Sequence, residues 1–71
     1  MTLDMAQIGN INTIISVKTE DPELNSFLLT LGCYQGQEIT VVTTISGSFT
    51  IAVLDSRYSI DNNLAKAILV K

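Results

Sequence analysis

Residues 21–32 form the one long stretch with helical spacing, and they constrain the fold more than any other feature. Four apolar side chains recur at positions i, i+3, i+4 and i+7, namely Leu24, Phe27, Leu28 and Leu31, and this spacing places them on one stripe of a helix. Asp21 can cap free amide groups, Pro22 suits the first helical position, and Gly32 suits a left-handed stop. We therefore expect a helix over residues 22–31. Because it would be marginal alone in water, it must dock its stripe on a sheet.

The segments on either side of this helix alternate in a period of two, which is typical of half-buried strands. Asp61 can cap a single helical turn before the last strand, and Gly47 suits the loop of a hairpin. The alternation predicts five strands, over residues 11–18, 39–44, 49–54, 58–60 and 67–70.

The small size of the chain limits how these elements can pack. Its 71 residues leave room for one hydrophobic core, so we expect a single domain over residues 1–71. Closure of a sheet removes its exposed edges, and this favours a closed or partly closed barrel. The predicted fold is mostly β: a small SH3-like barrel of about five strands, with one short α-helix inserted after the first strand.

Charge and hydropathy exclude several classes of function. Four Lys and Arg residues against seven Asp and Glu residues give a net charge of −3, which would repel a phosphate backbone, so no nucleic-acid partner is expected. No apolar run approaches the roughly 20 residues that cross a bilayer, so membrane insertion is not expected. Cys33 is the only cysteine and cannot form an internal disulfide, which agrees with a cytoplasmic location.

The residues that usually carry chemistry are scarce. The chain has no histidine, the usual general base, so we expect no enzyme activity and no catalytic residues. We interpret the adjacent acids Glu20, Asp21 and Glu23 as helix-capping and solvated charges, and we expect neither a metal site nor a cofactor. Cys33 follows the helix stop without a second ligand or a base, which favours a buried small apolar role.

Two spaced runs of residues resemble the FeoA family, the small cytoplasmic companions of the ferrous iron transporter FeoB. The segment from Leu24 to Gly32, followed by Gly36, Ile39 and Val41, resembles the family's run L-x-x-R-L-x-x-L-G-x-x-P-G-x-x-V-x-V. The second run, which resembles L-R-x-x-E-A-x-x-I-x-V, comprises Ile60, Ala65, Ile68 and Val70. Departures from the family pattern occur at Phe27, Gln35, Asp61 and Leu64, where the family has arginine, proline, arginine and an acidic residue.

This resemblance implies an SH3-like barrel that binds the cytoplasmic domain of a FeoB-type membrane transporter and modulates its GTP-linked activity or assembly. The same barrel forms the C-terminal domain of iron-dependent DtxR-type repressors, whose N-terminal winged helix is not among these 71 residues, so we do not expect a repressor. An alternative interpretation is a self-associating or metal-responsive regulatory domain that works as a homo-oligomer.

Three large apolar residues on and after the helix are candidates for partner binding. Leu29 lies off the apolar stripe, and Tyr34 lies in the following turn. Phe27 replaces the family's arginine, although its spacing also fits the core stripe. We expect the partner-binding surface to include Leu29 and Tyr34, with Phe27 as a third contact, because clustered exposed apolar side chains mark docking sites.

Overall fold

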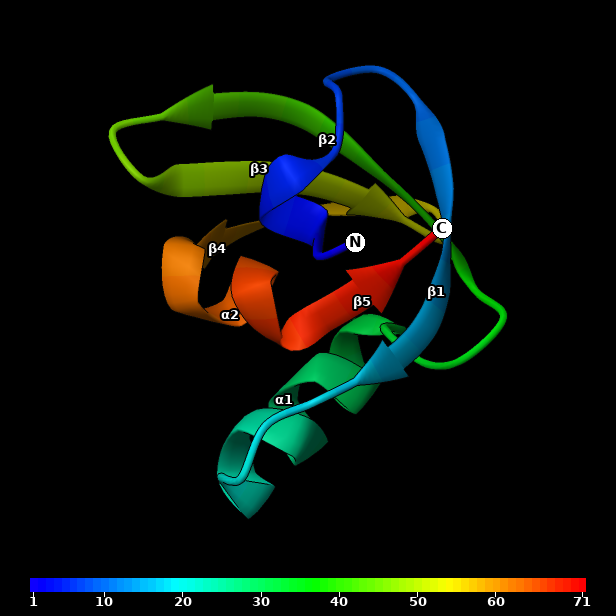
Figure 1. Ribbon diagram of the computed structural model, residues 1–71, viewed down its shortest axis with the longest axis vertical. Helices are drawn as coiled ribbons and strands as arrows, with labels where there is room; N and C mark the ends of the chain where they lie inside the picture. Colours follow the sequence, from blue (N-terminus) through cyan, green and yellow to red (C-terminus); the bar gives the residue numbers. More distant parts are fainter.

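Five antiparallel strands, two α-helices and a 3₁₀ turn make up the computed structural model, which describes residues 1–71 (Figure 1). The elements in chain order are η1 (Leu3–Met5), β1 (Ile11–Val17), α1 (Pro22–Leu31), β2 (Glu38–Ile45), β3 (Ser48–Val53), β4 (Ser56–Asp61), α2 (Asn62–Ala67) and β5 (Ile68–Val70). The sequence thus predicted every strand and the long helix.

The strands form one sheet in the order β4-β3-β2-β1-β5. Figure 1 shows the sheet curled so that α2 joins its two edge strands, β4 and β5. The side chain of Asp61 caps α2 by accepting a hydrogen bond from the Leu64 N–H at 2.8 Å, as the sequence predicted. Two short turns, at Ser46–Gly47 and at Leu54–Asp55, connect β2 to β3 and β3 to β4.

Apolar side chains from every layer meet inside the curled sheet. Leu3 of η1 and Ala65 of α2 are completely buried and close the end of the interior. The remaining members of the core are Ile14, Leu28, Leu31, Cys33, Ile39, Val41, Ile51, Val53, Ile60, Ile68 and Val70. Burial of a large apolar side chain stabilises a fold by about 1.5–3 kcal/mol. The burial of these side chains holds the short α1 against the sheet.

The two ends of the chain lie side by side (Figure 1). The Met1 amino group donates to the Val70 carbonyl at 3.1 Å, and the Val70 N–H donates to the Met1 carbonyl at 2.7 Å. Lys71 exchanges two further backbone hydrogen bonds with Thr13 of β1. The first and last residues therefore extend the hydrogen bonding of the sheet.

The apolar stripe of α1 is only half buried. Leu28 and Leu31 lie in the core, whereas Leu24 and Phe27 are 36% and 45% exposed. The expectation that all four residues dock inward is therefore wrong for Leu24 and Phe27. Leu24 lies in the first turns of α1, which reach past the sheet (Figure 1). Phe27 lies next to the fully buried Leu28, but about 100° around the helix from it, and so remains exposed.

Several element boundaries also differ from the expected ones, mostly by one or two residues. Leu54 was expected at the end of a strand, but it occupies the β3–β4 turn with a left-handed φ of 56° and is exposed. β4 begins at Ser56, and α2 continues to Ala67 instead of ending after one turn. In each case tertiary pairing or packing outweighs the local propensity of the segment.

Candidate functional site

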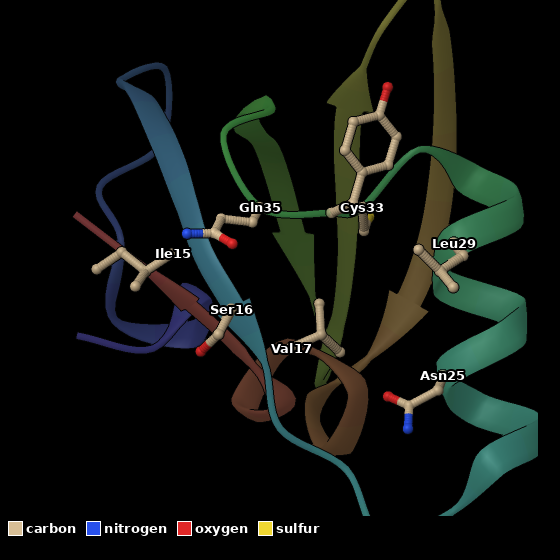
Figure 2. A pocket seen from close by; sticks show the side chains of 8 residues that line it. Ile15, Ser16, Val17, Asn25, Leu29, Cys33 and Gln35 are labelled. Atoms are coloured by element: carbon tan, nitrogen blue, oxygen red, sulfur yellow. The ribbon is translucent and has the colours of Figure 1, made fainter.

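A groove runs between β1 and α1 and is closed at one end by the loop that follows the helix (Figure 2). Its volume is about 450 Å³, within the range of pockets that hold small ligands or side chains. Eight residues line it: Ile15, Ser16, Val17, Asn25, Leu29, Cys33, Tyr34 and Gln35. In Figure 2, Leu29 and Asn25 project from α1 toward β1.

The end of α1 sets the direction in which the chain enters this groove. Gly32 has a left-handed φ of 100°, its N–H donates to the Leu29 carbonyl at 3.0 Å, and the Cys33 N–H donates to the Leu28 carbonyl at 2.9 Å. This pair of bonds is a Schellman motif, which requires positive φ at its turning residue. The motif directs Cys33 into the core and leaves Tyr34 at the surface.

The loop after Tyr34 is held against β1 by backbone hydrogen bonds. Gly36 donates to the Ile14 carbonyl at 2.8 Å, and Ile14 donates to the Gln37 carbonyl at 2.9 Å. Gln37 in turn donates to the Tyr34 carbonyl at 3.1 Å. The groove wall formed by Tyr34 and Gln35 is therefore fixed to the same strand that forms the opposite wall.

Cys33 behaves as a buried apolar group. Its side chain is fully buried, and burial raises the pKa of its thiol to about 11. Because the thiolate is the reactive form, a thiol with this pKa is inert at neutral pH. This confirms the predicted buried role of Cys33.

Ser16 is an anomaly in the groove wall. Its Oγ atom is buried and has no hydrogen-bond partner. β1 carries a register shift between Ile14 and Ser16, and an extra residue of this kind re-aims the side chains next to it. Leaving a buried hydroxyl unpaired costs about 1–3 kcal/mol.

Two of the three residues predicted for partner binding lie together in the groove. Leu29 and Tyr34 line it and are 58% and 44% exposed. Phe27 does not line it, because residues two positions apart on a helix point in nearly opposite directions. Sequence reasoning did not place Val17 and Asn25 in this surface, since their position depends on how β1 and α1 pack together.

Two further findings concern metal binding and membrane crossing. No three of the Cys, Asp and Glu side chains gather closely enough to hold a metal ion. No helix is long and apolar enough to span a bilayer.

Comparison with known proteins identifies the class of this fold. The family model described as "FeoA domain" matches residues 1–71. An iron uptake regulatory protein, FeoA, superposes with a TM-score of 0.89 at 19% identity, over 100% of this chain and 95% of its own. FeoA from Stenotrophomonas maltophilia was solved with zinc and is described as a procaryotic SH3 domain protein. It superposes with a TM-score of 0.88 at 21% identity, over 100% of this chain and 89% of its own.

A domain of a larger regulator has the same shape. A manganese-dependent transcriptional repressor in complex with manganese superposes with a TM-score of 0.90 at 18% identity, over 100% of this chain. The match spans 35% of the repressor's own length. No curated protein sequence matches the chain. The structural likenesses confirm the predicted SH3-like fold.

Proposed function

This chain belongs to the FeoA family, which is associated with ferrous iron transport, and on that basis we propose that it is an accessory protein of ferrous iron uptake. In this proposal it acts in the cytoplasm, binds the cytoplasmic domain of a FeoB-type transporter, and modulates its GTP-linked activity. The Stenotrophomonas maltophilia relative has been described as a candidate activating factor of bacterial ferrous iron transport. That description concerns the relative and supports the proposal by family membership.

The observation that carries the proposal is the apolar groove between β1 and α1. Leu29 of α1 and Tyr34 of the loop that follows it both line this groove and remain exposed. Large apolar side chains that cluster at a surface depression are typical of protein docking sites, in which a few such residues carry most of the binding energy.

The proposal is tested by titrating the chain into the soluble cytoplasmic domain of the transporter in a calorimeter and by measuring GTP hydrolysis with and without the chain. We expect saturable binding and a changed rate of hydrolysis. Absence of both binding and any effect on hydrolysis would contradict the proposal.

The second candidate is a regulatory domain that works through its own oligomer. It is favoured by one observation, the superposition on part of a manganese-dependent repressor. Sedimentation velocity, with and without Fe²⁺ or Mn²⁺, separates the two candidates. A metal-dependent oligomer that does not bind the transporter domain would favour the second.

A further inference from the structure

The half of β1 that borders the groove has an incomplete set of sheet neighbours. β2 pairs with β1 only at residues 11–13, and the loop after α1 bonds to it only at Ile14. After Ile14, β1 pairs with β5 alone. The other side of residues 15–17 therefore faces the groove without a neighbouring strand.

The backbone of Val17 is directed into this open side. The Lys18 N–H donates to the Ala67 carbonyl beside β5 at 2.7 Å. Successive residues of a strand send their N–H and C=O groups to opposite sides, so those of Val17 point away from β5. Figure 2 places Val17 between β1 and α1, below Leu29. The register shift next to it leaves Ile15 as the extra, unpaired residue of the strand.

From this geometry we propose that an extended segment of a partner protein binds in the groove as an added strand alongside residues 15–17. Its backbone would exchange hydrogen bonds with Val17, and one of its apolar side chains would pack against Leu29 and Tyr34. Strand addition beside a helix combines backbone affinity with side-chain pockets that select the sequence. The identity of the partner as the transporter rests on the proposed function, whereas the mode of binding does not.

Charge at one end of the groove indicates the chemistry of this segment. Asn25 lines the groove and donates to the Thr19 carbonyl at 3.3 Å, which brings the following turn to that end. The turn carries two acids, Glu20 and Asp21, against one cation, Lys18, whereas Glu23 lies two helix positions before Asn25 and so points away from the groove. The segment that fits is therefore apolar with a Lys or Arg at this end. A second copy of this chain, itself at −3, fits less well.

The test uses two probes on the full chain: a phage-displayed library of random 12-residue peptides, and the soluble cytoplasmic domain of the transporter. Val17→Pro removes the N–H that points into the groove, and Pro is tolerated where a strand edge is unpaired. Val17→Ala is the matched control because it removes the side chain and keeps the N–H. Amide hydrogen exchange of Val17 in the unsubstituted chain provides a measurement that does not depend on how the proline variant folds.

We expect the library to yield peptides with apolar centres and a basic flank, which bind Val17→Pro at least tenfold more weakly than Val17→Ala. Their binding should slow exchange of the Val17 amide at least tenfold. Failure to enrich any peptide, equal binding to the two variants with an unprotected Val17 amide, or self-association through the groove would each overturn strand addition.

The two probes separate this inference from the proposed function. Peptides that bind as an added strand while the transporter domain does not bind would leave the inference standing and contradict the function. A transporter domain that binds while protecting no Val17 amide would support the function and overturn the inference.

Discussion

Gly32, which ends α1, packs directly against Leu54 in the turn between β3 and β4. A Cβ atom added to Gly32 would lie 2.7 Å from Leu54 Cδ1 and 3.2 Å from Leu54 Cγ. Both residues have left-handed backbones, with φ of 100° at Gly32 and 56° at Leu54. Two distant turns thus meet at a point where a side chain on Gly32 would require Leu54 to move.

Gly32→Ala should destabilise the fold by about 1 kcal/mol or more, because alanine is strained at this φ. The contact with Leu54 adds a steric cost to that strain. Thermal melting of the variant measures the loss.

Gly36→Ala is the matched control, since Gly36 also has a positive φ of 88° but a Cβ atom added there would have no neighbour within 4 Å. Gly32→Ala should therefore be the more damaging change. Equal melting temperatures for the two variants would show that the contact with Leu54 contributes nothing.

Leu29→Ala and Tyr34→Ala should each weaken binding to the transporter domain by about 1–3 kcal/mol while leaving the melting temperature nearly unchanged. Both side chains are exposed and line the groove. Leu28→Ala is the structural control: it removes a fully buried side chain and should cost about 2–5 kcal/mol of stability. Calorimetric titration and melting of all three variants check the prediction.

Phe27→Ala tells whether the binding surface extends around α1. Phe27 is about as exposed as Tyr34 but lies outside the groove. Loss of binding in this variant would add Phe27 to the surface.

Normal binding and normal melting of Leu29→Ala and Tyr34→Ala would contradict the assignment of the groove.

Ser16→Ala should leave the free energy of unfolding unchanged or raise it by up to about 1 kcal/mol, because the substitution removes a buried hydroxyl that has no partner. Ser59→Ala, at an exposed position of β4, corrects for the different strand propensities of serine and alanine. Urea denaturation compares the two variants. A clear loss of stability specific to Ser16→Ala would mean that the hydroxyl is satisfied in solution.

Cys33 should make the fold less stable at alkaline pH. Its pKa of about 11 in the folded chain exceeds the value of about 8.5 for an unperturbed thiol. Below about pH 8.5 the thiol is protonated in both states, so stability is unaffected. Between about 8.5 and 11 only the unfolded state loses the proton, and stability falls as pH rises.

Denaturant unfolding of the unsubstituted chain and of Cys33→Ala between about pH 7 and pH 11 isolates this effect, because other groups titrate equally in both proteins. Above about pH 8.5, the free energy of unfolding of the unsubstituted chain should fall relative to that of Cys33→Ala. A difference that stays constant with pH would refute the buried thiol.

The fold was predictable where local chemistry and long-range packing agree. Asp21 caps α1 by accepting a hydrogen bond from the Glu23 N–H at 2.9 Å, and Pro22 and Gly32 lie at the two ends of the helix. The bounds of the helix could therefore be predicted from residues at or next to its ends. Cys33, directly after the helix stop, was predicted to be buried because the sequence offers it no base and no second ligand. These features depend on neighbours within a few positions.

The features that were missed depend on contacts between distant segments. Leu54 has no propensity for a left-handed turn, and it lies in one because β3 and β4 pair in the register Val53↔Ser56, which leaves Leu54–Asp55 as their connection. Two of the eight residues that line the groove were predicted to be exposed: Leu29 from its position off the core stripe, and Tyr34 from its place in the turn after the helix. Val17 and Asn25 belong to it because β1 loses its second neighbour after Ile14, which alternation alone does not reveal.

The paired ends of the chain have a consequence for engineering. Because Met1 bonds to Val70 and Lys71 bonds to Thr13, a short linker between the ends would close the polypeptide into a ring with little distortion. New ends could then be opened at the Ser46–Gly47 turn, on an exposed loop away from the groove. Such a circular permutant, or an insertion of the whole domain into a host loop, should keep the β1–α1 groove intact.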